Sequence, residues 1–340
     1  TIKYSLNQGV NWINHINPYS RKLNSIQDME MTFSPNPGSV IVGDSGTIIR
    51  KEIDSSYLYK ILDNNSIKSF FYTTGIFDQN LRSTNTPGFE WPKGSGKYAN
   101  FTSGLSTAAK VNGQLRQAMC TYGGEYYPGY CNNGVVGSNA NFKVYTVRRG
   151  DSHLSNPDWQ NWGLMVPYGA PFVDVNMSGN YEPMIDTPGV KNASQTVFMC
   201  LTDGFPESHY VGEGSGGGTL PLYAELHLTA WSYSQPSYTD MQFVKFDVIN
   251  KGVSPWTNTF FSLFADVDLG DASDDFIGCD TARDLAFGYN ADNNDPIYGQ
   301  SPPAFGLLLL KGGFSKYITP QKQYDMTSFV TTNKWITCMR

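Results

Sequence analysis

Three segments of alternating polar and apolar residues, at 220–231, 242–250 and 261–269, constrain the fold most. In the first segment, one face consists of Leu222, Ala224, Leu226, Leu228 and Ala230. Alternation with a period of two is typical of a strand that buries one face. Three such strands joined by turns predict a sheet of an all-β protein, a β-sandwich of the jelly-roll or immunoglobulin-like kind.

The composition supports an all-β fold and argues against two classes of partner. Charged residues make up 16% of the 340 residues, against about 25% in an average soluble protein. Gly, Tyr, Phe and Asn are plentiful, and long helix-forming runs are absent. The net charge of −6, without any basic stripe, argues against nucleic-acid binding. The longest aliphatic run, residues 307–310, is too short for a membrane span.

The N-terminal part differs in pattern from the rest. Ile2, Tyr4 and Leu6 alternate and predict a lone strand, while residues 39–53 predict a β-hairpin. We therefore divide the chain into an extension at 1–69, which could act as an assembly arm, and a β-sandwich with long loops at 70–340. A second hairpin is predicted around the turn Asn112-Gly113. The glycine-rich segment 212–217 formally matches G-x-G-x-x-G, but the strand pattern that follows it predicts a flexible loop.

A dense run of carboxylates follows the third alternating segment. Asp266 and Asp268, two positions apart on a strand, project to the same side. Gly270 lets the chain turn and bring later carboxylates back towards them. Bare carboxylates at this density repel one another, and a hard cation such as calcium relieves the repulsion. The predicted ligands are Asp266, Asp268, Asp271, Asp274, Asp275 and Asp280, and Asp284, Asp292 and Asp295 could extend the site. A solvated acidic turn is the alternative.

Cysteines and glycosylation motifs add weaker predictions. Cys120 and Cys131 flank a Gly/Tyr/Pro loop and would close it by a disulfide in an oxidising compartment. Four Asn-x-Ser/Thr motifs offer glycosylation at Asn64, Asn100, Asn176 and Asn192. The chain begins at Thr1 without a signal peptide, and we interpret it as a mature or trimmed form.

Several motifs resemble one family of exported proteins. The motifs include the segments 91–97, 103–105, 110–116 and 127–129 and, most specifically, the acidic run D-x-D-L-G-D-x-x-D-D-F-I-G-C-D at 266–280. Over roughly residues 88–330 the chain is similar to large secreted and cell-surface proteins of the Bacteroidota and Ignavibacteria group, which are cargo of the type IX secretion route. The resemblance implies an extracellular or cell-surface location, and no catalysis is assigned to this module.

These observations favour one function and leave two alternatives open. The favoured function is an extracellular structural protein, stiffened by calcium, that forms a homo-oligomeric coat or filament by strand addition. A calcium-dependent carbohydrate-binding adhesin is the first alternative, with Trp159, Trp162 and Trp231 as candidates for stacking on glycans, although core packing is the favoured explanation of such aromatics. A glycoside hydrolase is less favoured; its loose carboxylate candidates are Glu90, Glu125, Glu207 and Glu225.

Overall fold

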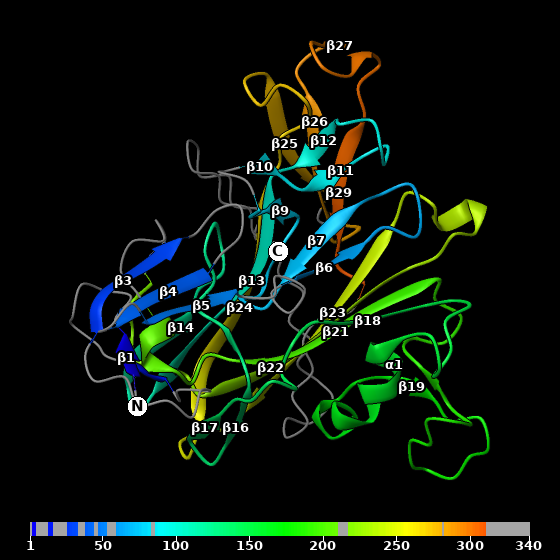
Figure 1. Cartoon of the computed structure of the whole chain (residues 1–340). Coiled ribbons are helices and arrows are strands. Elements are labelled where there is room, and N and C mark those ends of the chain that lie inside the picture. Colours follow the sequence, from blue (N-terminus) through cyan, green and yellow to red (C-terminus); the bar gives the residue numbers. More distant parts are fainter. Residues whose placement is uncertain are drawn as a thin grey trace. The chain divides into compact units, whose positions relative to one another are not determined.

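The computed structural model describes residues 59–82, 86–209, 217–280 and 282–310, together with five strands within residues 1–56. The chain divides into two units, Thr1–Ser56 and Tyr57–Arg340 (Figure 1). This division lies earlier than the boundary at 69/70 that we predicted. The reason is that β6 (Tyr59–Leu62) pairs with β7 (Ser69–Tyr72) and so belongs to the larger unit.

The N-terminal unit contains two small antiparallel sheets. In the first, β1 (Ile2–Tyr4) pairs with β2 (Ile13–His15), so the prediction of a lone N-terminal strand is wrong. In the second, β3 (Ile26–Thr32), β4 (Gly38–Gly43) and β5 (Thr47–Glu52) form a meander. The β4–β5 pair confirms the hairpin predicted at 39–53. Its turn, like most of the glycine-rich segment 212–217, lies outside the described residues.

The first sheet of the larger unit has six strands centred on β13 (Thr102–Val111). One edge of β13 pairs with β8 (Ile76–Phe77) and then with β14 (Gln114–Ala118), while the other edge pairs with β24 (Trp256–Asp266). The strands β7 and β6 continue the sheet beyond β8. Asn112 and Gly113 join β13 to β14 with φ angles of 51° and 80°, which confirms the predicted hairpin turn.

The second sheet has five strands. β21 (Gln195–Thr202), β22 (Ala224–Ser232) and β23 (Gln242–Asn250) pair in chain order. The outer edge of β21 pairs with β15 (Tyr127–Pro128) at one end and with β18 (Tyr145–Arg148) at the other. The segments predicted at 220–231 and 242–250 are therefore strands, although the first begins only at Ala224. Tyr223 just before it has a φ of 59°, which is incompatible with a strand.

The main hydrophobic core lies between these two sheets, so the fold is the predicted all-β sandwich. The first sheet contributes Phe71, Phe77 and Leu105, and the facing strands contribute alternate residues of β21 and β22. The buried members from the second sheet are Val197, Met199, Leu201, Ala224, Leu226, Leu228 and Ala230. Of these, Ala224, Leu226, Leu228 and Ala230 belong to the face that the period of two predicted to be buried.

A second cluster covers the opposite face of the five-stranded sheet. Here α1 (Pro157–Asn161) and the short helices η3 (Trp162–Leu164) and η4 (Val166–Tyr168) pack on that face (Figure 1). Asn156 caps α1 by accepting hydrogen bonds from the backbone N–H groups of Asp158 and Trp159. Trp162 is fully buried in this cluster.

A third, smaller sheet carries the acidic loop. It consists of β25 (Asp275–Asp280), β26 (Leu285–Asn290) and β29 (Ala304–Leu308), at the top of the view in Figure 1. Leu269, Phe305 and Ala99 form its small core.

Short strand pairs complete the described fold: β9 (Gln79–Asn80) with β10 (Thr86–Pro87), β11 (Phe89–Glu90) with β12 (Tyr98–Asn100), β16 (Tyr130–Asn132) with β17 (Val135–Gly137), β19 (Phe172–Val173) with β20 (Thr187–Pro188), and β27 (Asn294–Asp295) with β28 (Gly299–Gln300). Two further 3-10 helices are η5 (Pro206–Ser208) and η6 (Pro236–Tyr238).

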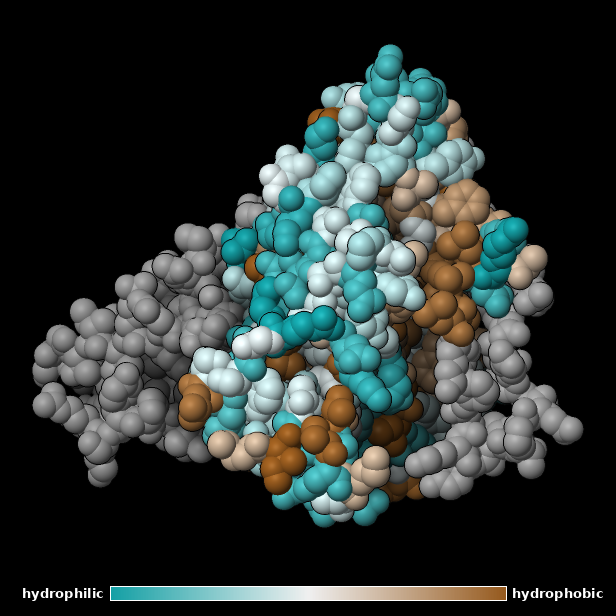
Figure 2. All heavy atoms as spheres, turned by 90° about the vertical axis from the view of Figure 1, so that its right-hand side faces the viewer, coloured by the Kyte–Doolittle hydropathy of each residue, from teal (hydrophilic) through white to brown (hydrophobic). Residues whose placement is uncertain are grey.

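The surface is polar with local hydrophobic areas. Figure 2 shows one face of the molecule, on which hydrophobic residues lie in separate brown areas among hydrophilic ones. Among the described residues, no helix has the length and apolar character needed to cross a membrane.

The sandwich core predicts a large effect for Leu228→Ala. Leu228 is fully buried between the two sheets, and truncating such a side chain leaves a cavity that costs about 3 kcal/mol. Urea unfolding followed by circular dichroism measures the loss. Leu154→Ala is the matched control, because Leu154 is 84% exposed and should leave the free energy of unfolding unchanged. Equal effects of the two substitutions would contradict the assignment of the core.

Candidate functional site

The acidic stretch forms the loop between β24 and β25. Leu269 anchors it by packing into the third cluster, and the backbone N–H of Gly270 donates to Tyr98 O at 3.0 Å. Gly270 has a φ of 76°, and a Cβ at this position would lie 2.4 Å from Asp295 Oδ1. Only glycine therefore allows the turn that brings the second half of the loop, and Asp295, against the first half.

Electrostatic repulsion is concentrated in this loop. Burial, reinforced by the charge of Asp266, raises the pKa of Asp268 to about 6. Burial also raises the pKa of Asp275 to about 7, and the charges of Asp268, Asp274 and Asp295 add to this shift. The backbone N–H of Leu269, which donates to Asp275 Oδ2 at 2.8 Å, offsets only part of it. Four carboxylates thus interact unfavourably with no basic side chain among the causes.

Three buried oxygens in the same region have no hydrogen-bond partner within the described part of the chain. They are Oδ1 of Asp274, Oδ1 of Asp275 and Oδ1 of Asn290. Asn290 is 7% exposed, and its Nδ2 donates to Asp274 Oδ2 at 3.2 Å and to the backbone oxygens of Asp292 and Asn294. Buried polar atoms are nearly always paired, so three such oxygens in one loop are candidate ligands for a cation.

The structure brings together only some of the six predicted ligands. Asp268, Asp274 and Asp275 belong to the cluster. Asp295 lies beside it, and its oxygens accept from the backbone N–H groups of Asp271, Ile297 and Tyr298. The other three are held by protein groups. Asp266 accepts from the Tyr122 hydroxyl at 2.8 Å, Asp271 accepts from the backbone N–H of Ser273 at 3.0 Å, and Asp280 forms a salt bridge with Arg283.

Asn290 is the member of this cluster that the sequence did not predict. It lies opposite Asp275 in the register of β25 and β26. The alternation of 285–290 indicates a strand, but nothing in the sequence indicates which strand it pairs with.

The donor set suits a hard cation. Asp268, Asp274, Asp275, Asp295 and Asn290 offer only oxygen atoms, and calcium accepts six to eight oxygen ligands in flexible geometry. No three of these carboxylates bring one oxygen each within 4.8 Å of one another. A bound ion would therefore draw the loop closer and take its remaining ligands from water.

A second buried charge cluster is structural. Asp203 accepts from the backbone N–H groups of Leu222 and Ala224, both at 2.6 Å. Glu125 accepts from the N–H groups of Met119 and Gly218. His209 lies between them, with Nδ1 3.5 Å from Glu125 Oε2 and Nε2 2.7 Å from Asp203 O. Burial alone would lower the pKa of His209, but the hydrogen bond and charge of Asp203 and the charge of Glu125 raise it.

The predicted disulfide is wrong. Cys120 and Cys131 both carry buried thiols. Cys120 Sγ lies 3.8 Å from Thr74 O, and Cys131 Sγ lies 3.6 Å from Lys251 O. Their closeness in sequence misled the prediction, because Cys120 belongs to the sandwich core and Cys131 lies in β16 beside the second sheet.

The four predicted glycosylation positions differ in exposure. Asn100 is fully buried, and its Nδ2 donates to Asp78 Oδ2 and Ser103 Oγ. Asn64 is half-buried and donates to Ser194 O at 2.7 Å. Asn176 and Asn192 are exposed and are the two positions that a glycan can reach.

The aromatic and glutamate candidates divide between core and surface. Trp162 is core, and Trp159 packs on the second cluster. Trp231 stacks on Phe243 with ring centroids 5.5 Å apart, beside Tyr233 and Tyr238. Three glutamates are held by structural contacts. Glu90 accepts from Lys68 and from two backbone N–H groups, Glu125 accepts as described above, and Glu225 pairs with His227.

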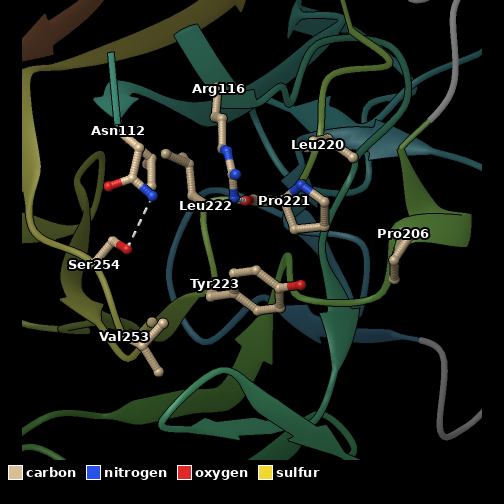
Figure 3. Close-up of a pocket in the computed structure, with 11 residues that line it drawn as sticks. Asn112, Arg116, Pro206, Leu220, Pro221, Leu222, Tyr223, Val253 and Ser254 are labelled. Carbon is tan, nitrogen blue, oxygen red and sulfur yellow. Dashed lines mark hydrogen bonds between the residues drawn. The ribbon is translucent and has the colours of Figure 1, made fainter. Parts of the chain in front are cut away.

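A cavity of about 250 Å³ lies at the opposite end of β13 and β24 (Figure 3). Arg116, Tyr223 and Val253 line it, and Arg116 Nη1 donates to Pro221 O at 2.8 Å. Across its rim Asn112 Nδ2 donates to Ser254 Oγ at 3.2 Å. The length of β24 separates this cavity from the acidic loop by roughly 30 Å. The cavity and the acidic loop therefore cannot form one composite site.

Fold and site together define an all-β sandwich protein with an acidic oxygen-donor loop. Comparisons with protein-family models, with curated proteins and with solved structures find no match to this chain.

Asp275→Asn is expected to act in opposite directions with and without calcium. In a chelator near pH 7 the substitution removes a repelled charge, so we expect a gain in stability of roughly 1 kcal/mol, allowing for solvent screening. With calcium at 100 times its Kd, the wild type gains about 2.7 kcal/mol, and the variant gains much less. Thermal unfolding in both buffers measures the effects. Asp271→Asn is the control, and a variant that responds to calcium like the wild type would contradict the site.

The same carboxylates predict a pH dependence in the chelator. The folded pKa values of Asp268 and Asp275 are raised to about 6 and about 7, above the ordinary value of 3.8. Because the folded state binds these protons more tightly than the unfolded state, the free energy of unfolding is highest below pH 3.8 and falls as the pH rises towards 7. Asp268→Asn/Asp275→Asn should flatten this loss, which urea unfolding at several pH values would show. A steeper loss in the double variant would contradict the shifts.

His209 predicts a separate pH dependence. Its pKa is raised in the folded state, so its contribution to stability is complete below the ordinary value of 6.5 and is lost as the pH rises through the folded pKa. His209→Gln should be less stable than the wild type at pH 6 and should lose this slope above pH 6.5. His153→Gln, away from the cluster, should keep the slope; an unchanged slope in His209→Gln would contradict the assignment.

Proposed function

We propose that this chain is an extracellular structural protein of the cell surface, which assembles with further copies of itself by strand addition at β24 and is stiffened by calcium at the acidic loop. The exposed edge of β24 carries this proposal. Among the described strands, β24 pairs only with β13. Its seven residues Thr257–Leu263 are all exposed.

The exposed segment is apolar and regular. Phe260 is 61% exposed, and Phe261 and Leu263 are 49% and 38% exposed. The register with β13 shifts between Thr257 and Phe260 but is continuous from Phe260 to Asp266. Monomeric proteins protect such edges with Lys, Pro or a covering segment, and β24 contains neither Lys nor Pro. An edge that is regular, apolar and unpaired within the described part of the chain is a template for a further strand.

The opposite edge of the same sheet shows what a covered edge looks like. The backbone N–H of Gln117 in β14 donates to Thr219 Oγ1 at 2.9 Å, and that hydroxyl donates to Gln117 O. Arg116 reaches the same segment through Pro221 O. The edge at β14 is thus closed within the chain, whereas no strand among the described residues pairs with the outer edge of β24.

We assign the added strand to the N-terminal unit of a neighbouring copy. The strands described within residues 1–56 pair only with one another, and these residues form a unit of their own. A contact between two different surfaces of identical chains is heterologous, and such contacts produce open filaments or rings.

Calcium bound at the end of β24 would strengthen the proposed contact between copies. The acidic loop directly follows Asp266, the last residue of β24. An ion bound by the oxygens of Asp268, Asp274 and Asp275 would hold the loop and so reduce fraying of the strand. Extracellular modules bind calcium at about 0.1–1 mM, which fits a secreted protein. The resemblance to type IX secretion cargo supports the same location.

A calcium-dependent adhesin that binds carbohydrate is the second candidate. The surface group of Trp231, Tyr233, Tyr238 and Phe243 favours it, because Tyr238 is exposed and the rings of this group lie within stacking distance of one another. Binding of this chain to a glycan array, lost in Trp231→Ala and Tyr238→Ala, would support this function.

Phe261→Lys is expected to abolish assembly. A lysine in the open edge repels an incoming strand without disturbing a buried contact. In millimolar calcium we expect filaments of the wild type by electron microscopy, shorter ones in a chelator, and only monomers of the variant. Leu115→Lys is the matched control, since Leu115 is 61% exposed on β14. A wild type that remains monomeric at all protein and calcium concentrations would contradict the proposal.

A further inference from the structure

Three metal-ligating side chains meet on the face of the second sheet that is turned away from the sandwich core. The register of β21 and β22 places Cys200 directly opposite His227 and Thr202 opposite Glu225. Glu225 and His227, two positions apart, point to the same side of β22. The alternate residues Leu226 and Leu228 face the main core, so pairing and pleat together bring a thiol, a carboxylate and an imidazole to one place.

The three groups are close enough to share an ion. One ligand atom from each of Cys200, Glu225 and His227 lies within 4.8 Å of the others. His227 Nε2 is 2.9 Å from Glu225 Oε1. Zinc binds sulfur at about 2.3 Å and nitrogen or oxygen at about 2.0–2.2 Å, so tetrahedral ligands lie about 3.3–3.7 Å apart. Only small side-chain movements separate this arrangement from a zinc site.

The surroundings fix the two side chains of β22. Glu225 Oε2 accepts from the backbone N–H of Cys131 at 3.1 Å, which directs Oε1 towards His227 Nε2. A Cβ at Gly169 would lie 2.4 Å from His227 Nδ1, so the backbone of Gly169 lies closely against the imidazole ring. Outer contacts that orient the ligands are typical of metal centres. All three ligand residues are buried.

Alternative contacts of the three groups are weak or can be displaced. The Cys200 thiol donates to Gly129 O at 3.3 Å. Lys251 Nζ lies 3.6 Å from Glu225 Oε1, but its side chain is 37% exposed and can turn to solvent. Asp247, in register with His227 on β23, adds a further carboxylate to the same face.

We propose that Cys200, Glu225 and His227 bind one zinc ion, with water in the fourth position. A thiolate, an imidazole and a carboxylate match zinc, whereas calcium prefers oxygen ligands alone. Binding replaces the S–H bond of Cys200 by a sulfur–zinc bond and releases the proton to solvent. The site is separate from the acidic loop and does not depend on the function proposed for that loop.

Cobalt binding to the purified full chain tests this proposal. Cobalt(II) is titrated into protein freed of metal by a chelator, in excess calcium so that the acidic loop is saturated. We expect one equivalent, a thiolate-to-cobalt charge-transfer band in the ultraviolet, and displacement of both by one equivalent of zinc. Binding should tighten as the pH rises, because the thiol must lose its proton.

Variants make the outcome decisive. Cys200→Ser should lose the charge-transfer band, and His227→Gln should weaken zinc binding at least tenfold. Cys120→Ser is the matched control, since Cys120 is another buried thiol, and it should keep the band. A folded wild type without the band, or a band that persists in Cys200→Ser, would overturn the proposal. Filament formation is a separate measurement, so the two proposals fail independently.

Discussion

The pairing of β13 with β24 is the constraint on which the other features depend. It runs from Val111 opposite Trp256 to Thr102 opposite Asp266. At one end Trp256 packs against the main core, and at the other end the acidic loop begins. β13 needs glycine at position 104, since a Cβ there would lie 2.5 Å from Cys120 Sγ. One strand pair thus links the sandwich core, the open edge and the acidic loop.

Buried carboxylates elsewhere in the chain show why the acidic loop differs. Glu90 accepts from Lys68 and from the backbone N–H groups of Gly94 and Gly96. Asp203 accepts from two backbone N–H groups at 2.6 Å and lies beside His209. At both of these buried carboxylates the fold therefore supplies hydrogen-bond donors. In the acidic loop it places carboxylates together and leaves oxygens without a hydrogen-bond partner among the described residues, which is the pattern that the proposed cation would relieve.

The sequence predicted well what depends on local pattern. Strands β22, β23 and β24, the Asn112-Gly113 turn and the position of the acidic loop follow from alternation and turn chemistry. What it could not predict depends on pairing between distant segments. Asn290 joins the acidic loop through the register of β25 and β26, and Asn100 is buried by its contacts with Asp78 and Ser103. Cys120 and Cys131 are close in sequence, yet they lie in different environments. The residues of the proposed zinc site meet only through the pairing of β21 with β22.

The two proposed metal sites differ in the step at which an ion would act. Cys200, Glu225 and His227 are buried beneath the segment that includes Gly169, so an ion there would bind as this segment packs on the sheet and would contribute to folding. The carboxylates of the acidic loop are only partly buried. An ion there could exchange with the surroundings, and the stiffness of the loop would follow the calcium concentration. A protein that folds before it assembles needs this order, because the sandwich must be complete before the edge of β24 can receive another strand.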